Sequence, residues 1–314
     1  MAGTRGQVRP SPGERGLASH QPGEVAALLD PAWECIEGTA ERIDLGAGTR
    51  LSGWTARQVL VHLGSWDDDD LGQRVAEARG GVVEPAEDTD ARNARLVSTH
   101  HDASRDEVLA ALRRARRATS DYLLGDEVEA TGTAPVASPV GELPLTGLLV
   151  ARAYELAVHA LDLVPAGAPA PEDPLVTAGL AALADVTGSL LARRELVTAF
   201  AVLTPVASWV VGAADGDWTT ARLEPGRPGR SVGCPSIEGL AVDVLDASAG
   251  RVSGAQLLLT RRLRGHDVPG LLQLLPAIQS AQGLPGGAGV RAAADVLAGA
   301  GRAVTGLSSL LPRR

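Results

Sequence analysis

A line of four polar residues interrupts one of the most apolar segments of the chain, residues 145–164 (LTGLLVARAYELAVHALDLV). Arg152, Glu155, His159 and Asp162 are spaced three, four and three residues apart, which places them on one stripe of an α-helix. Leu, Val and Ala occupy the other faces. The helix is therefore predicted to be buried, with its polar stripe satisfied inside the protein.

Glu155 and His159 lie one helical turn apart and can bind the same metal ion, because carboxylate oxygen and imidazole nitrogen are both good zinc ligands. The alternative is a buried ion pair between Arg152 and Glu155 beside a hydrogen-bonded His159. The spacing E-x-x-x-H also arises by chance, so this segment alone leaves both interpretations open.

A third candidate ligand lies in the segment GWTARQVLVHLGSWD, residues 53–67. Thr55 followed by Gln58 forms a capping box, which predicts the first turn of a helix. His62 then lies two turns inside this helix, among apolar residues. It is the third ligand that Glu155 and His159 need, although a histidine on an apolar helix also fits an ordinary core position.

Four main helices must position these side chains, and their apolar stripes predict a helical bundle. A second capping box, Ser104 with Glu107, opens one of them. The helix that contains His62 is predicted to continue through the acidic run Asp67–Asp70 to about Arg79, with the acids as a solvated face that binds no metal. The predicted helices are Asp30-Pro31 to about residue 45, Thr55 to about Arg79, Ser104 to about Leu124, and 145–164, with a short helix over 90–99 that contains Asn93.

Composition narrows the class of protein. The 314 residues carry a net charge of −9, with a pI of about 5.2, which argues against nucleic acid and anionic membrane as main partners. All basic residues are Arg, a usage typical of a high-GC bacterial genome. Cys35 and Cys234 are isolated and form no zinc motif or disulfide framework. No apolar run of membrane-spanning length and no signal-peptide core is apparent, so a soluble cytoplasmic protein is predicted.

The proline-rich segment PAGAPAPEDP, residues 165–174, is predicted to be a linker between two domains. Beyond it, strand patterns separated by Gly, Asp and Pro turns predict a smaller α+β domain. The predicted organisation is a disordered leader (1–22), a helical bundle (23–164), the linker (165–174), the α+β domain (175–283) and a tail without assigned structure (284–314). Strands are expected at 200–203, 208–212, 218–224 and 237–244, and helices at 175–194, 255–262 and 268–279.

The motifs GWTARQVLVHLGSWD and RAYELAVHALDL, with the short Asn93-containing helix between them, resemble the N-terminal domain of the mycothiol-dependent maleylpyruvate isomerase family. The resemblance covers roughly residues 24–164 and implies a DinB-like four-helix metal-binding bundle. The second domain is similar, more loosely, to the sterol-carrier-like C-terminal domain of the same family. The expected fold is thus an α+β two-domain protein.

The resemblance implies that His62, Glu155 and His159 are the metal ligands. Three protein ligands leave a coordination position open, as in catalytic zinc sites. Arg152 would balance charge near Glu155, and Asp162 would orient an imidazole or pair with Arg152. No residue beyond the metal site is assigned a catalytic role, and neither cysteine is expected to act as nucleophile.

The family's thiol co-substrate is mycothiol, which zinc would hold as a thiolate at neutral pH. The implied reaction is isomerisation or S-transfer on a small electrophile. The opposing hypothesis is a metal-binding or small-molecule-binding protein without turnover, because DinB-like bundles share a fold without sharing a function. Zinc content and thiol-dependent turnover discriminate between the two.

Overall fold

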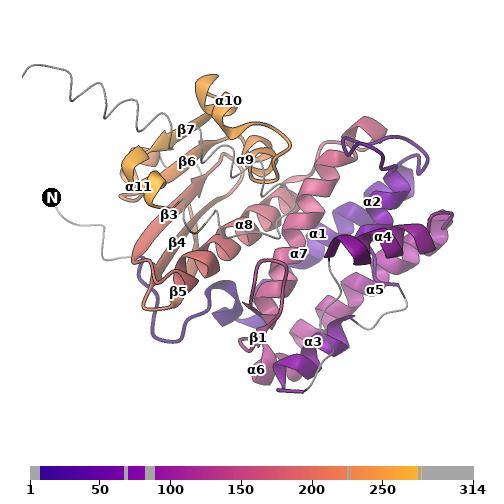
Figure 1. Cartoon of the computed structure of the whole chain (residues 1–314), viewed down its shortest axis with the longest axis horizontal. Coiled ribbons are helices and arrows are strands. Elements are labelled where there is room, and N and C mark those ends of the chain that lie inside the picture. The colour runs from indigo at the N-terminus through magenta and orange to yellow at the C-terminus, as the bar shows by residue number, and fades with distance from the viewer. Residues whose placement is uncertain are drawn as a thin grey trace, which may run out of the picture.

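An N-terminal helical domain leads into a C-terminal sheet domain in the computed structural model, which describes residues 8–66, 70–81, 89–224, 226, 228–274 and 277 (Figure 1). The predicted combination of a helical domain followed by a mixed domain is confirmed. The first domain consists of α1 (Pro22–Arg42), α2 (Ala56–Leu63), α3 (Asp70–Ala78), α4 (Thr89–Thr99), α5 (Arg105–Leu124), α6 (Glu127–Thr131), the short strands β1 (Pro135–Val136) and β2 (Leu143–Pro144), and α7 (Leu145–Asp162).

The second domain is built on a five-stranded sheet with the strand order β5-β4-β3-β6-β7. Strands β3 and β6 are parallel, and the other neighbours are antiparallel. The elements are α8 (Asp173–Arg193), β3 (Thr198–Leu203), β4 (Ser208–Ala214), β5 (Asp217–Leu223), β6 (Ser236–Gly239), α9 (Ala241–Ser248), α10 (Gly254–Leu259), β7 (Leu263–His266) and α11 (Val268–Gln273).

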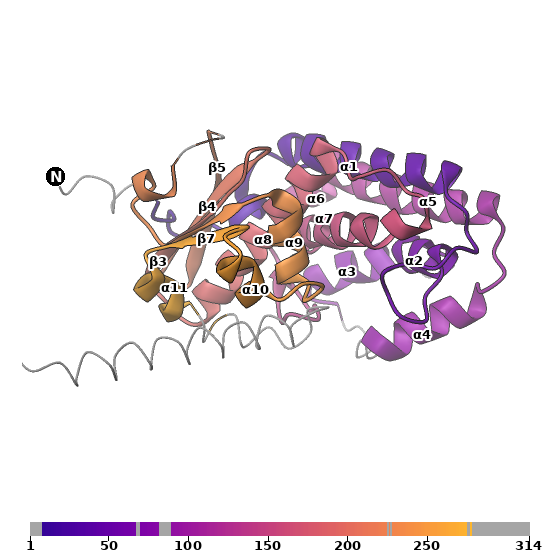
Figure 2. The ribbon, with the colours of Figure 1, turned by 90° about the horizontal axis from the view of Figure 1, so that it is seen from above.

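Helix α8 is shared by the two domains. It packs against α7 and α1 on one side and against β4 and β5 on the other (Figures 1 and 2). One continuous hydrophobic core therefore runs from Ile36 in α1 to Val211 in β4. Contrary to the sequence prediction, α8 is long and apolar enough to cross a membrane by length and composition, but 83% of its most apolar window is buried inside the protein. A helix that is buried on both sides in the core of a protein is apolar on nearly all faces, which accounts for the composition of α8.

Both predicted capping boxes are present. The Thr55 side chain accepts from the Gln58 N–H while the Gln58 side chain accepts from the Thr55 N–H. Ser104 and Glu107 make the same reciprocal pair at the start of α5. Because these contacts are local in sequence, the first residues of α2 and α5 follow from the motif alone.

In the helical domain, one helix start and one helix end differ markedly from the sequence prediction. Helix α1 begins at Pro22, and Pro31 lies inside it, because the apolar periodicity extends over both prolines and buries the first turns. Helix α2 ends at Leu63 and does not continue to Arg79. At Gly64 the chain turns away, and a Cβ there would lie 2.8 Å from the Ala111 side chain of α5. Residues 67–69 of the acidic run lie outside the described residues.

The predicted disordered leader is wrong for residues 8–22, whereas residues 1–7 lie outside the described residues. Gly16–Ser19 form a 3-10 helix that buries Leu17. The carboxylate of Asp185 on α8 accepts from the Leu17 N–H, the Trp218 indole N–H and the Thr220 hydroxyl. The Gly- and Pro-rich composition of this segment gave no sign that it is ordered, because the residues that it contacts lie far away in the sequence.

In the sheet domain, the strand predicted over 237–244 is confined to β6, and α9 follows it. Strand β7 was not predicted, because LRGH is short and lacks an apolar alternation. At the start of the proposed linker, Val164–Ala166 form a 3-10 helix, and Ala166 and Ala168 join the core. The domain boundaries at 165–174 stay a prediction, and the tail at 284–314 lies outside the described residues.

Candidate metal centre

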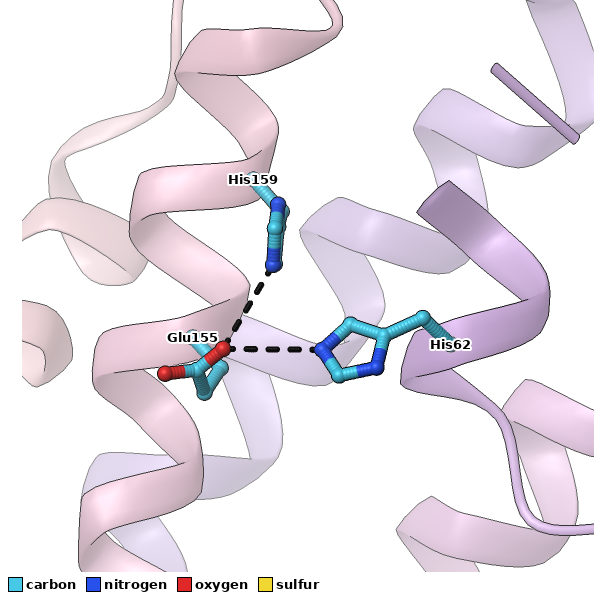
Figure 3. A group of neighbouring side chains, drawn as sticks. All are labelled: His62, Glu155 and His159. Carbon is cyan, nitrogen blue, oxygen red and sulfur yellow. Dashed lines mark ion pairs between the residues drawn. The ribbon is translucent and has the colours of Figure 1, made fainter. Parts of the chain in front are cut away.

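His62 of α2 and Glu155 and His159 of α7 converge on one point between the two helices (Figure 3). The Glu155 Oε2 atom lies 3.5 Å from His62 Nε2 and 3.4 Å from His159 Nε2. One ligand atom from each residue lies within 4.8 Å of the other two. In the part of the chain that the structure describes, no other group of three such residues meets this criterion.

These separations fit a single metal ion. Two ligands at about 2.0–2.1 Å from a tetrahedral zinc are roughly 3.3–3.4 Å apart. The two carboxylate–imidazole separations are close to that value. The third separation, between the ligand nitrogens of the two histidines, is within 4.8 Å, and small side-chain movements would bring it to the same value. The donor set of two imidazoles and one carboxylate, with a position left open, is the kind that catalytic zinc sites use.

His159 is held in the orientation that metal binding requires. Its Nδ1 lies 3.0 Å from Asp162 Oδ2, and Asp162 is fully buried. Burial acts to raise the pKa of Asp162, but hydrogen bonds from His159 and Arg251 outweigh it and hold the pKa below its usual range. An ionised carboxylate can only accept, so Nδ1 carries a proton. A metal ion that displaces the Nε2 proton would therefore find the Nε2 lone pair directed at the centre.

His62 is held in the same way by a different residue. Its Nδ1 lies 3.1 Å from Asn93 Oδ1 on α4. With the amide oxygen accepting from Nδ1–H, Nε2 of the neutral ring again faces Glu155. The side chain of His62 is 11% exposed and that of Glu155 is 20% exposed, so the centre is mostly but not completely enclosed.

Arg152 fixes the position of α2. Its guanidinium donates to the carbonyl oxygens of Leu63, at 3.1 Å, and His62, at 3.5 Å. These carbonyls belong to the last turn of α2, where cations are favourable. Arg152 therefore joins the helix that bears His62 to the helix that bears the other two candidate ligands.

The electrostatics of the centre follow from burial and mutual contact. Burial acts to raise the pKa of Glu155, but hydrogen bonds and charge from His159 and His62 reverse this effect and hold the pKa well below its usual range. Burial lowers the pKa of His62. For His159 burial is opposed by hydrogen bonds to Asp162 and Glu155, which raise the pKa. The carboxylate is thus ionised, as a metal ligand must be.

Neither cysteine has the character of a nucleophile. Burial, with the nearby Glu172, raises the pKa of Cys35 to about 11. Burial, with the charge of Asp267, raises the pKa of Cys234 to about 11. Both side chains are free thiols and stay protonated at neutral pH.

Sequence reasoning brought together the three candidate ligands but missed two contacts. Asn93 was noted only as part of a short helix, and its spacing to His62 carries no helical or strand periodicity. Arg251 of the sheet domain, which donates to Asp162, follows a Gly in a turn after α9 and carries no sequence signal.

The helical part of this chain is similar to known proteins. A family profile described as "Mycothiol maleylpyruvate isomerase N-terminal domain" matches residues 25–164. Among solved structures, the crystal structures of the mycothiol-dependent maleylpyruvate isomerase and of a mutant of it are similar, each with 16% identity and a TM-score of 0.48. They cover 76% of this chain and 93% and 92% of their own. A search of curated proteins gives no match.

The profile matches residues 25–164, a segment that contains all three candidate ligands. It includes all but the first three residues of α1 and continues to the end of α7. Residues 25–164 of this chain are therefore similar to the mycothiol maleylpyruvate isomerase N-terminal domain family.

Proposed function

We propose that this protein is a metal-dependent enzyme that uses a low-molecular-weight thiol, mycothiol, as co-substrate in an isomerisation or S-transfer on a small electrophile. The observation that carries the proposal is the convergence of His62, Glu155 and His159 on one point, with each imidazole oriented through its Nδ1. The similarity of this helical domain to a family named for mycothiol and maleylpyruvate isomerase supports the choice of thiol.

A bound zinc ion would lower the pKa of a thiol at the open coordination position, so that the thiolate is available at neutral pH. The residues of the chain supply the conditions for this chemistry. Glu155 offsets one of the two positive charges of a divalent ion, which leaves the site net positive and attractive to a thiolate. Asp162 and Asn93 keep protons on the Nδ1 atoms and so keep both Nε2 lone pairs available.

The first test concerns the metal. Purified protein is expected to contain about one divalent ion per chain, with zinc favoured by two imidazoles and one carboxylate. His62→Ala and His159→Ala should each abolish this content in elemental analysis while circular dichroism shows the helices retained. His101→Ala is the matched control, because this histidine is exposed and, among the residues that the structure describes, its ring has one hydrogen-bond contact, with the Ser98 carbonyl. Full metal content in either ligand variant would contradict the assignment.

The second test concerns turnover. The metal-loaded protein is screened with mycothiol and small electrophiles that carry activated double bonds, maleylpyruvate among them. Loss of the electrophile only when both metal and thiol are present is the expected result. A protein that binds metal but turns over no electrophile would instead support the alternative, a metal-binding protein without catalytic activity.

The proposal also places the protein in the cytoplasm. Its two cysteines are free thiols and form no disulfide, which suits a reducing compartment. Fractionation of the native host, with the protein detected by antibody, tests this placement.

A further inference from the structure

The metal centre is connected to the sheet domain through one buried carboxylate. Asp162, at the end of α7, accepts two hydrogen bonds from Arg251, one from Nε at 3.0 Å and one from NH2 at 2.8 Å. The same carboxylate holds His159 Nδ1. A bidentate guanidinium–carboxylate pair fixes both groups in a plane and is stronger than a neutral hydrogen bond. The orientation of His159 therefore depends on a residue outside the helical domain.

Arg251 is itself held by its surroundings. Its backbone N–H donates to the Asp246 carbonyl oxygen, at 2.8 Å, in the turn that follows α9. The Asp246 side chain pairs at 2.8 Å with Arg50, from the segment between α1 and α2. Arg50 in turn donates its backbone N–H to the Asp162 carbonyl oxygen at 3.0 Å. The result is a closed ring of charges and backbone contacts in which Asp162 is the only member with no exposed surface.

A second contact between the two domains lies beside this ring. Tyr154, the residue before Glu155, is buried, and its hydroxyl lies 3.0 Å from the Ser248 Oγ atom at the end of α9. Both contacts join α7 to the same end of α9. The sheet domain therefore packs directly against α7, the helix that carries two of the three candidate ligands.

From this geometry we infer that Arg251 is a positioning residue of the metal centre: through Asp162 it fixes the Nδ1–H tautomer and ring orientation of His159, so that the sheet domain sets the metal affinity of the helical domain. This inference rests on the proposed metal site. It assigns to the second domain a role in completing the centre, in addition to any part it has in binding an organic substrate.

The test measures the dissociation constant of zinc by competition with a chromophoric chelator, on the full chain. Arg251→Gln is expected to weaken zinc binding about 10- to 100-fold, the range for residues that orient metal-bound imidazoles. Arg251→Lys keeps the charge but loses the bidentate geometry, so it is expected to lose less. The d–d absorption of bound Co²⁺ should shift in Arg251→Gln, because the imidazole moves relative to the ion.

Arg262→Gln is the matched control. Arg262 also makes two hydrogen bonds to a buried carboxylate, Asp243, which lies on α9. That pair stabilises the sheet domain but does not contact Asp162. The control is expected to lose stability yet to keep zinc binding within about twofold of wild type, since independent sites act additively.

The route through Asp162 is tested by a double-mutant cycle. If Arg251 acts through Asp162, then Asp162→Asn with Arg251→Gln should bind zinc no more weakly than Asp162→Asn alone. Additive losses, or a wild-type dissociation constant in folded Arg251→Gln and Arg251→Lys, would overturn the inference. A wild-type chain that binds no zinc would contradict the proposed metal site itself, and that outcome is distinct from the first two.

Discussion

His62 Nδ1 lies 3.1 Å from Asn93 Oδ1, and this contact joins α2 to α4 across thirty-one residues of sequence. It is the counterpart of the contact between His159 and Asp162 on α7. Each candidate imidazole ligand thus has its own oxygen acceptor on the side away from the centre. One acceptor is a neutral amide and the other an ionised carboxylate, so the two imidazoles are not equivalent.

The first prediction follows from that difference. Asn93→Ala removes the acceptor of the His62 Nδ1–H, so zinc affinity is expected to fall about 10-fold, at the lower end of the range for such contacts. Asn93→Asp keeps an acceptor in place and is expected to retain the affinity of wild type or to exceed it. Chelator competition on the two variants checks this, and equal losses in both would show that the oxygen at this position has no influence on His62.

The second prediction compares the two capping boxes. Thr55→Ala and Ser104→Ala each remove the hydrogen bond that the N-cap hydroxyl accepts from a backbone N–H, and each is expected to lower the free energy of unfolding by about 1 kcal/mol. Helix α2 is only eight residues long and carries His62, whereas α5 carries no candidate ligand. Zinc affinity should therefore fall in Thr55→Ala alone. Denaturant unfolding and zinc titration, performed on both variants, test the two parts separately.

What could be predicted from sequence depended on how far apart the interacting residues lie. The capping boxes and the pairing of Glu155 with His159 are local, and the structure contains them as expected. The prediction that a helix begins at Asp30-Pro31 was wrong because it also relied on a local pattern alone. It has the local form of a helix start, yet Gln21 and Pro22 precede it, and the burial of Val25 and Leu29 extends the helix over it.

Contacts between distant segments could not be predicted. Arg251 was indistinguishable in sequence from the other arginines of an Arg-rich chain, and only the packing of α9 on α7 brings it to Asp162. Leu17 and Asp185 are separated by 168 residues. The segment around Leu17 is buried through such distant contacts, which leave no local periodicity in its sequence. The motif shared with the isomerase family supplied the ligand set, but not the residues that orient it.

A third prediction concerns pH and the buried Asp185. Burial raises the pKa of this carboxyl above its ordinary value of 3.8, although three hydrogen bonds to it act in the other direction. Ionising it therefore destabilises the folded state more than the unfolded chain, and the stability contributed by the protonated acid is lost as pH rises through the folded-state pKa. Asp185→Asn should remove this loss. Its free energy of unfolding relative to wild type is expected to increase as pH rises above 3.8.

The measurement is denaturant unfolding of both proteins at a series of pH values from 4 to 7, on the metal-free chain. A difference between the two proteins that decreases as pH rises would show that the hydrogen bonds from Leu17, Trp218 and Thr220 outweigh burial.

A fourth prediction concerns the source of the nucleophilic sulfur. The Cys35→Ser, Cys234→Ser double variant is expected to keep full metal content and full thiol-dependent turnover, because the pKa of each thiol is about 11. Turnover should vanish in the wild type when mycothiol is withheld. Activity that depends on either cysteine, and persists without added thiol, would place the nucleophile on the chain and contradict the proposed role of the co-substrate.

The last prediction concerns the charge of the centre. Glu155→Gln keeps the shape of the side chain and an oxygen donor but makes the site one unit more positive. Removing the charge of a coordinating carboxylate weakens its attraction to a divalent ion, so zinc affinity is expected to fall by about 100- to 1000-fold. Thiol-dependent turnover measured at saturating zinc should also slow, because the oriented carboxylate is lost from the coordination sphere. The fold should persist, since the 20% exposed side chain packs at the edge of the core. Zinc affinity equal to that of wild type would exclude Glu155 as a ligand, and thiol-independent hydrolysis by the metal-loaded wild type would instead indicate a bound hydroxide as nucleophile.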